Sequence, residues 1–156
     1  MTTVIPGRFA AKMDEPFAVF IIGMRINKLW AVHKWLPVAK AMPRMLKELG
    51  ADPELGMLHV EPIRYRRGFA TIQYWKSFKH LEHYATKVAT HTEAWREFNR
   101  AIGEDGSVGI WHETYVVQPN AFEAVYGNMP RFGLGAAGDH IKADGAYNKA
   151  RGRMSA

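Results

Sequence analysis

Residues 106–135 read GSVGIWHETYVVQPNAFEAVYGNMPRFGLG, and the fold expected for the chain depends on this stretch. β-Branched and aromatic residues fill positions 108–117, between a glycine and a proline, which is typical of a strand. Side chains two positions apart share a face of a strand, so His112 points away from three large neighbours: Trp111, Glu113 and Tyr115. Neither face is purely apolar or purely polar, and we therefore expect this strand to line a pocket.

The segment that follows, Tyr126–Gly135, is too rich in glycine and proline to predict regular structure. It still carries large apolar side chains, so we expect it to pack on the domain as a loop that covers the pocket. Three of its residues are candidates for substrate contacts: Tyr126, Asn128 and Met129.

Upstream, hydrophobic periodicity predicts two helices and three more strands. A near-continuous apolar run at 17–26 predicts a central strand. Helical spacing over 28–49 predicts a helix that Pro37 and Pro43 interrupt, with a short piece up to Trp35 and a longer one ending at Gly50. The remaining elements are a strand at 56–65, a strand at 69–75, a helix capped by Ser77, and a second helical piece that a capping-box pattern starts at Thr90.

The predicted order is strand, helix, strand, strand, helix, strand, which is the ferredoxin-like β-α-β-β-α-β arrangement of the α+β class. Its antiparallel sheet carries helices on one face, and a second copy of the chain can cover the other face. We expect one domain at 16–135, preceded by an irregular N-terminal arm at 1–15 and followed by a mobile basic tail at 136–156.

Composition limits the classes of function. The 156 residues include no cysteine, which excludes disulfides, thiolate metal sites and cysteine nucleophiles and favours a reducing, cytoplasmic location. The N-terminus lacks the apolar stretch of a signal peptide, and no apolar run approaches the roughly 18 residues of a membrane span, so no membrane partner is expected. The net charge of +6 is scattered along the chain, and we expect no nucleic-acid partner.

Five segments resemble the fumagillin-pathway monooxygenase-like family, and they occur in the family's order. The resemblance extends over residues 16–134 and rests on these segments: Phe20–Trp30, Gln73–Phe78, His91–Phe98, Val108–Tyr115 and Tyr126–Pro130. It implies a dimeric α+β barrel, in which the sheets of two ferredoxin-like units close together and each unit keeps a pocket between its sheet and its helices. The same superfamily includes antibiotic-biosynthesis monooxygenases and heme-degrading monooxygenases.

The heme-degrading relatives carry a tryptophan at a strand end and a histidine on the next helix. Trp75 and His91 are similar in position, although the spacing between them differs by several residues. The resemblance therefore implies heme as one possible cofactor, with His91 as its axial ligand. His91 can also be a pocket acid or base, or simply a histidine at a helix end that stacks on Trp95.

Without a cofactor, the substrate itself must supply the electrons that reduce dioxygen. The protein then needs a general base, for which His91 and His112 are the candidates, and a dry aromatic pocket. Arg25 or Asn128 can hold the substrate oxygen, and Thr71 and Gln73 can make the pocket polar. The candidate walls are aromatic: Trp75, Trp95, Trp111, Tyr115 and Tyr126.

Metal and nucleotide sites are not predicted. His80 and His83 share a helical face without a third ligand, and Gly133–Gly135 does not form a GxGxxG motif. The sequence thus predicts a monooxygenase-like homodimeric enzyme that oxidises an aromatic or polyketide-like small molecule. The alternatives are a heme enzyme of the same fold and a non-catalytic small-molecule-binding or stress-response module.

Overall fold

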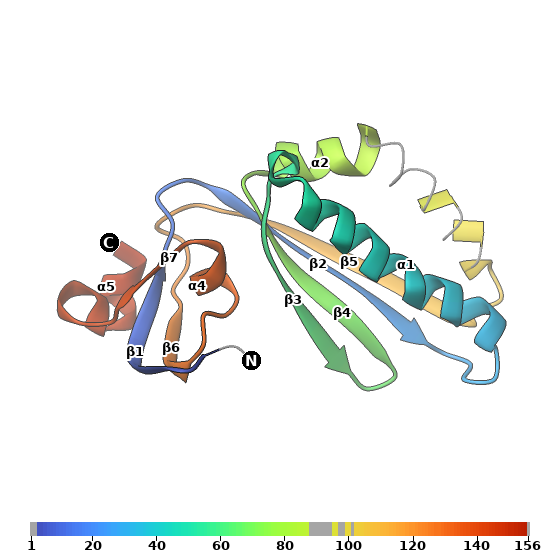
Figure 1. Ribbon diagram of the computed structural model, residues 1–156, viewed down its shortest axis with the longest axis horizontal. Helices are drawn as coiled ribbons and strands as arrows, with labels where there is room; N and C mark the ends of the chain where they lie inside the picture. The colour runs from blue at the N-terminus through green and yellow to red at the C-terminus, as the bar shows by residue number, and fades with distance from the viewer. Residues whose placement is uncertain (1–2, 88–94, 97–98, 101, 156) are drawn as a thin grey trace.

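A computed structural model describes residues 3–87, 95–96, 99–100 and 102–155. Within these residues the strands form two antiparallel sheets, a four-stranded one and a three-stranded one, which lie beside each other (Figure 1). The strands are β1 (Ile5–Lys12), β2 (Phe17–Ile26), β3 (Met57–Tyr65), β4 (Gly68–Trp75), β5 (Val108–Val117), β6 (Val125–Met129) and β7 (Asp139–Lys142). The helices are α1 (Val32–Ala51), α2 (Phe78–Lys87), α4 (Leu134–Ala137) and α5 (Ala150–Ser155), with short 3-10 turns at Pro53–Leu55 and Gly145–Asn148.

The large sheet has the order β3-β4-β2-β5 and confirms the ferredoxin-like α+β fold. The apolar strand β2 lies inside this sheet and pairs with β4 on one side and with β5 on the other. Helices α1 and α2 lie over the same face of the sheet (Figure 1). The opposite face is the side that a second copy was expected to cover, and we call it the open face.

Helix α1 differs from the prediction because it is continuous from Val32 to Ala51, with Pro37 and Pro43 inside it. Each proline removes one backbone hydrogen bond, which made a break at Pro37 the expected outcome. The helix nevertheless buries an apolar stripe on the sheet, including Val38 and Leu49. Burial of such a stripe provides most helical stability in proteins, and here it outweighs the lost hydrogen bonds.

The core at one end of the large sheet is built around Trp75, which is fully buried. Trp75 packs with Leu49 of α1 and with Leu81 and Tyr84 of α2. As predicted, Ser77 caps α2, because its hydroxyl oxygen accepts a hydrogen bond from the backbone N–H of His80 at 3.4 Å. This cluster fixes both helices against the sheet.

The terminal segments are more ordered than the sequence suggested. Residues 5–12, expected in an irregular arm, form β1 at the centre of the small sheet, between β6 and β7. Residues 125–129, expected in a covering loop, form β6. Both strands contain glycine, and β1 pairs with segments more than a hundred residues away, so no local pattern indicated the pairing.

The segment expected as a mobile basic tail carries β7 and α5. Arg153 of α5 is buried, and its Nε donates a hydrogen bond of 2.8 Å to Glu123 Oε2. Its Nη1 donates to the backbone carbonyls of Tyr147 and Asn148, each at 2.9 Å. One arginine thus ties the end of the chain to the segment before β6, because its guanidinium has donors for several acceptors at once.

The small sheet is attached to the open face through the segment that leads into α4. The backbone N–H of Gly133 donates a hydrogen bond of 2.9 Å to Glu61 Oε1 on β3. A Cβ atom on Gly133 would lie 3.1 Å from the hydroxyl oxygen of Tyr74 on β4, so the two segments are in close contact. Burial raises the pKa of Tyr74 to about 12, with Tyr126 and Glu61 adding to the shift, and the phenol therefore stays protonated.

Candidate functional site

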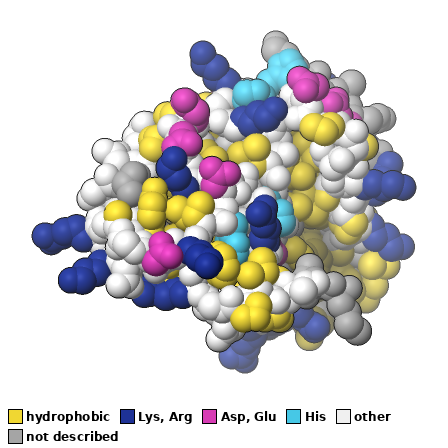
Figure 2. Space-filling view, turned by 60° about the vertical axis from the view of Figure 1, so that its left-hand side comes forward, with side chains coloured by type: hydrophobic (Ala, Val, Ile, Leu, Met, Phe, Trp, Pro, Cys, Tyr) yellow, Lys and Arg dark blue, Asp and Glu magenta, His cyan; other side chains and the backbone are white. Residues whose placement is uncertain are grey.

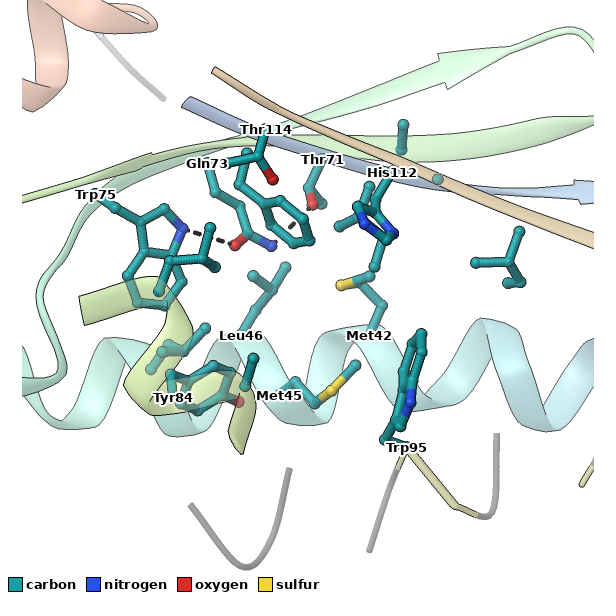
Figure 3. A pocket seen from close by; sticks show the side chains of 18 of the residues that line it. Met42, Met45, Leu46, Thr71, Gln73, Trp75, Tyr84, Trp95, His112 and Thr114 are labelled. Atoms are coloured by element: carbon teal, nitrogen blue, oxygen red, sulfur yellow. Dashed lines mark hydrogen bonds between the residues drawn. The ribbon is translucent and has the colours of Figure 1, made fainter. Parts of the chain in front are cut away.

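A cavity of about 380 Å³ lies between the helices and the large sheet. Figure 3 shows its two walls, the sheet on one side and α1 with α2 on the other. The part of the helical wall that α1 supplies is apolar and carries Met42, Met45 and Leu46, and Trp95 stands beside them. Trp95 keeps 39% of its surface exposed, so this side of the cavity is only partly closed by described residues. Small-molecule sites are typically concave and mainly apolar, as this one is.

The sheet wall carries four polar side chains, and the register of the strands explains their arrangement. On β2, Phe20 and Ile22 form an apolar central stripe. Phe20 lies between Gln73 of β4 and Thr114 of β5, and Ile22 lies between Thr71 and His112. Paired residues share a face of the sheet, so each row presents a polar group on either side of one apolar side chain. Those four residues are Thr71, Gln73, His112 and Thr114.

Three side chains of β4 form a hydrogen-bonded row at two-residue spacing (Figure 3). The indole Nε1–H of Trp75 donates to Gln73 Oε1 at 3.0 Å. Gln73 Nε2 donates to Thr71 Oγ1 at 3.2 Å. Gln73 and Thr71 are each only 4% exposed, so the row is held in a dry environment.

His112 projects from the edge strand β5 toward the helical wall and faces Met42 and Trp95 (Figure 3). Its ring lies 5.6 Å from the ring centre of Phe20, at an interplanar angle of 47°. An imidazole can accept and return a proton near neutral pH, and it can also bind a metal. His112 is therefore the titratable side chain on the sheet wall best suited to proton transfer.

The inner end of the cavity is closed by Trp75 and Tyr84, whose ring centres lie 5.8 Å apart. Burial raises the pKa of Tyr84 to about 12, and the charge of Glu48 adds to the shift. The phenol of Tyr84 therefore stays protonated near neutral pH. Among the described lining residues Glu82 is the one carboxylate.

The structure brings together part of the predicted site. Trp75, Trp95 and His112 line the cavity. The residues predicted from the covering loop belong to β6 in the small sheet and are not part of the cavity lining: Tyr126, Asn128 and Met129. His91 lies outside the described residues.

The remaining candidates lie on the open face, because their strand positions alternate with those that line the cavity. The Trp111 indole donates to the Tyr65 hydroxyl oxygen at 2.9 Å, and the Tyr115 hydroxyl donates to Glu113 Oε2 at 2.6 Å. This bond to the carboxylate raises the pKa of Tyr115. Arg25 Nη1 donates to Asn27 Oδ1 at 3.0 Å, at the end of β2.

Comparison with models of protein families shows to which family the chain is related. Residues 17–134 match the model of the family described as Monooxygenase af470-like. The chain belongs to this family. No curated protein sequence shows significant similarity to it.

Two solved structures share the fold of this af470-like chain. A crystal structure of aldoxime dehydratase has a TM-score of 0.66 and 18% sequence identity, over 81% of this chain and 39% of that one. The aldoxime dehydratase OxdRE in complex with butyraldoxime has a TM-score of 0.62 and 18% identity, over 83% of this chain and 39% of that one. The af470-like chain thus spans about two fifths of the length of these enzymes, and at this identity the likeness concerns the fold.

Some lining residues of the af470-like chain were not among the candidates from the sequence. Thr114 shares a strand face with His112, and the alternation in 108–117 was sufficient to include it. Met42 and Met45 lie on the apolar stripe of α1. The sequence pattern of such a stripe is the same whether the helix packs on a core or lines a cavity. No sequence signal separates those two cases.

The described part of the af470-like chain contains no cluster of three or more His, Cys, Asp or Glu side chains suited to a metal ion. Its described helices include none with the length and apolar character needed to cross a membrane. Basic side chains are spread over the surface seen in Figure 2 and are interspersed with acidic and apolar ones.

Proposed function

We propose that this chain is a monooxygenase-like enzyme that oxidises an aromatic or polyketide-like small molecule in the cavity between sheet and helices. One observation carries the proposal: a mainly apolar cavity between sheet and helices is lined by an imidazole, His112. Membership of the af470-like family supports the reaction class. The substrate and the reaction are proposals because fold alone does not fix chemistry.

The proposed reaction uses electrons from the substrate. His112 accepts a proton from an activated CH₂ group, and the carbanion reduces dioxygen and combines with it to give a hydroperoxide on the same carbon. The proton held by His112 returns to the peroxide. Loss of water then leaves a carbonyl, so that CH₂ and O₂ become C=O and H₂O. One oxygen atom enters the product and the other leaves as water.

The cavity walls support such a step in two ways. The apolar side chains of Phe20, Met42 and Met45 make the surroundings of a bound ligand less polar than water, which strengthens electrostatic interactions with a developing anion. Hydrogen-bond donors on the sheet wall are positioned to stabilise that anion. A general base contributes about 10²–10⁴-fold to rate.

Oxygen consumption by the purified protein with a panel of phenols, naphthols and cyclic ketones tests the proposal. His112→Ala is expected to lower turnover by about 10²–10⁴-fold. The matched control is His83→Ala, which removes an exposed histidine from α2 and should leave turnover unchanged. Equal turnover of His112→Ala and the wild-type protein would refute the role of His112. Binding without turnover across the panel would instead identify a non-catalytic binding module.

The second candidate function is a heme enzyme, which the position of His112 in an apolar cavity favours. The fit of the described lining residues is partial: they offer one imidazole and apolar walls but no lysine or arginine to pair with the heme propionates. A bound heme would supply an iron centre for dioxygen or for a ligand such as butyraldoxime. Of the two histidines that would hold the heme iron, His112 lines the cavity, and His91 lies outside the described residues.

A hemin titration followed by absorption spectroscopy tests this candidate. Saturable binding with a sharp Soret band that shifts on reduction would support a heme protein, and loss of that band in His112→Ala or in His91→Ala would identify the ligand. Hemin binding no stronger than to an unrelated protein would exclude the candidate. Butyraldoxime belongs in the substrate panel of a heme-loaded protein, because one structural neighbour binds it.

We also propose that two copies of the chain associate through the open face. Large apolar side chains are partly exposed there, including Ile63 and Trp111 at 37% and Tyr115 at 50%. Association of two such sheets would form the barrel that the family resemblance implies. Light scattering during size-exclusion chromatography should give twice the monomer mass of 17.7 kDa, and Trp111→Glu should shift the protein toward the monomer. A wild-type protein that is monomeric at micromolar concentration would refute this proposal.

A further inference from the structure

We propose that Thr71 and Gln73 form a binding site that presents two hydrogen-bond donors and that holds the oxygen of a phenolate or enolate. The substrate would then be a ring with an acidic carbon placed opposite that oxygen. This inference deepens the proposed function and rests on the same cavity. Its basis is the donor and acceptor inventory of the buried row on β4.

Trp75 fixes the orientation of the Gln73 amide. An indole nitrogen can only donate, so the Gln73 atom that faces it at 3.0 Å must be the carbonyl oxygen. The amide nitrogen of Gln73 therefore points along the strand toward Thr71, at 3.2 Å. Trp75 is fully buried, and its ring cannot turn without disturbing the core cluster.

The fixed amide in turn fixes the role of Thr71. Its hydroxyl oxygen accepts a hydrogen from Gln73, which leaves the hydroxyl hydrogen available for another acceptor. The second N–H of Gln73 is available as well. Within the described part of the chain, neither hydrogen has a protein acceptor, and both residues line the cavity. A buried donor without a partner costs free energy, so a ligand acceptor at this point would gain affinity.

Strand register places this site and His112 on either side of one apolar side chain. Thr71 and His112 flank Ile22, and their Cα atoms are two strand spacings apart, which is about 10 Å. All three side chains line the cavity from the same face of the sheet, so a ligand that contacts both Thr71 and His112 lies over Ile22. A flat ring with an oxygen at one end and a reacting carbon at the other suits this position.

The two ends of the site then act on one conjugated system. Removal of a proton at the carbon opposite the oxygen places negative charge on that oxygen. Donors at Thr71 and Gln73 would stabilise this charge as it develops, in the manner of an oxyanion hole. Proton removal and charge stabilisation would thus occur at opposite ends of the same ring.

Titration of bound 4-nitrophenol tests the donor site without any turnover. Phenolate formation is followed by absorbance, with and without protein. The wild-type protein should bind the phenolate at least tenfold more tightly than the phenol, which lowers the apparent pKa of the probe by at least about one unit. Thr71→Val removes the hydroxyl at nearly constant shape and should abolish most of this preference, and Gln73→Met should do the same.

Thr114→Val is the matched control, because Thr114 lines the same wall from β5 and lies outside the row on β4. It should keep the preference for phenolate. The inference is overturned if the wild-type protein does not bind the probe or binds phenol and phenolate equally well. It is also overturned if Thr71→Val and Gln73→Met both keep the preference for phenolate, or if Thr114→Val loses this preference to the same extent as they do. Phenolate binding together with no oxygen consumption across the substrate panel would refute the proposed oxygenase and leave the donor site standing.

Discussion

Trp111 and Tyr65 meet across the width of the large sheet, on its open face. The indole Nε1–H of Trp111 donates to the Tyr65 hydroxyl oxygen at 2.9 Å, and that hydroxyl donates to the Met24 carbonyl oxygen at 2.6 Å. The contact joins β5 to β3, which are not neighbours in the sheet. It is possible because Gly23 leaves room for the indole: a Cβ there would lie 2.8 Å from Trp111 and 2.9 Å from the Ala70 Cβ.

The first prediction concerns this close approach. Gly23→Ala should lower the free energy of unfolding by about 1–3 kcal/mol, because the added methyl group displaces the indole or separates the strands. Urea denaturation monitored by tryptophan fluorescence measures the change. Gly50→Ala is the control: an added Cβ would have no atom within 4 Å, and alanine in a helix is favoured by about 0.5–1 kcal/mol over glycine. Equal stability of the two variants would argue against the packing described.

The second prediction concerns the anchored end of the chain. Arg153→Gln leaves Glu123 and the carbonyls of Tyr147 and Asn148 without their buried donor. The loss should destabilise the packing of α5 by about 1–3 kcal/mol, because the acceptors around a buried guanidinium lose their hydrogen bonds. Limited proteolysis should then cut within 139–156 at protease levels that the wild-type protein resists. Arg151→Gln, on an exposed part of α5, should retain the wild-type pattern.

The third prediction concerns pH. Burial lowers the pKa of His140, and the charge of Arg131 lowers it further. Its ring stacks on Phe9 at 4.5 Å, and its buried Nε2 has no hydrogen-bond partner among the described residues. The unfolded chain therefore takes up this proton at higher pH than the folded chain, so stability is lost as pH falls from about 6.5, the unfolded value, to the folded pKa.

Comparison of urea midpoints at about pH 7.5 and pH 5.5, on either side of the unfolded value, measures this contribution. His140→Phe keeps the stack on Phe9 and cannot titrate, so its midpoint should fall less between the two pH values than that of the wild-type protein. His83→Gln, at an exposed position, should retain the wild-type pH dependence. An unchanged pH dependence in His140→Phe would show that other groups cause the loss of stability in acid.

The fourth prediction concerns the prolines of α1. Pro43→Ala restores a backbone N–H inside the helix at an exposed position, and it should raise the free energy of unfolding by up to about 3 kcal/mol. Pro53 is the control, because it begins a 3-10 turn where proline fits. Pro53→Ala should be neutral or slightly destabilising. Urea denaturation measures both changes. If the urea midpoint of Pro43→Ala is no higher than that of the wild-type protein, α1 is adapted to its missing hydrogen bond.

Local patterns were sufficient to predict the strands of the large sheet and the presence of α1 and α2, although not the continuity of α1 through Pro37. The apolar run at 17–26, the turn before Gly68 and the cap at Ser77 each have a signal within a few residues. The small sheet had none, because β1 pairs with segments near the other end of the chain. Its pairing depends on tertiary contacts that periodicity does not encode, and Gly7 and Gly127 obscure even the strand pattern.

The candidate site was predictable only to the level of strand faces. The alternation of side chains along the strand predicted that His112 and Trp111 point to opposite sides of the sheet. It could not show which of these two side chains points toward the helices. Two of the aromatic candidates, Trp111 and Tyr115, lie on the open face, because the sequence gives exposed aromatic residues and pocket-lining ones the same pattern. The position of Gln73 in a buried hydrogen-bonded row appeared only in the structure, because it depends on the packing of Trp75.

The polar groups of the cavity have unequal freedom to change during evolution. Thr71 and Gln73 sit on an interior strand and are tied to a core tryptophan, so substitutions there carry a stability penalty. His112 and Thr114 sit on an edge strand, where a new side chain disturbs fewer neighbours. Selection for a new substrate would therefore act first on β5. A directed-evolution library confined to positions 110, 112 and 114 should diversify the chemistry of the cavity while most of its members still fold.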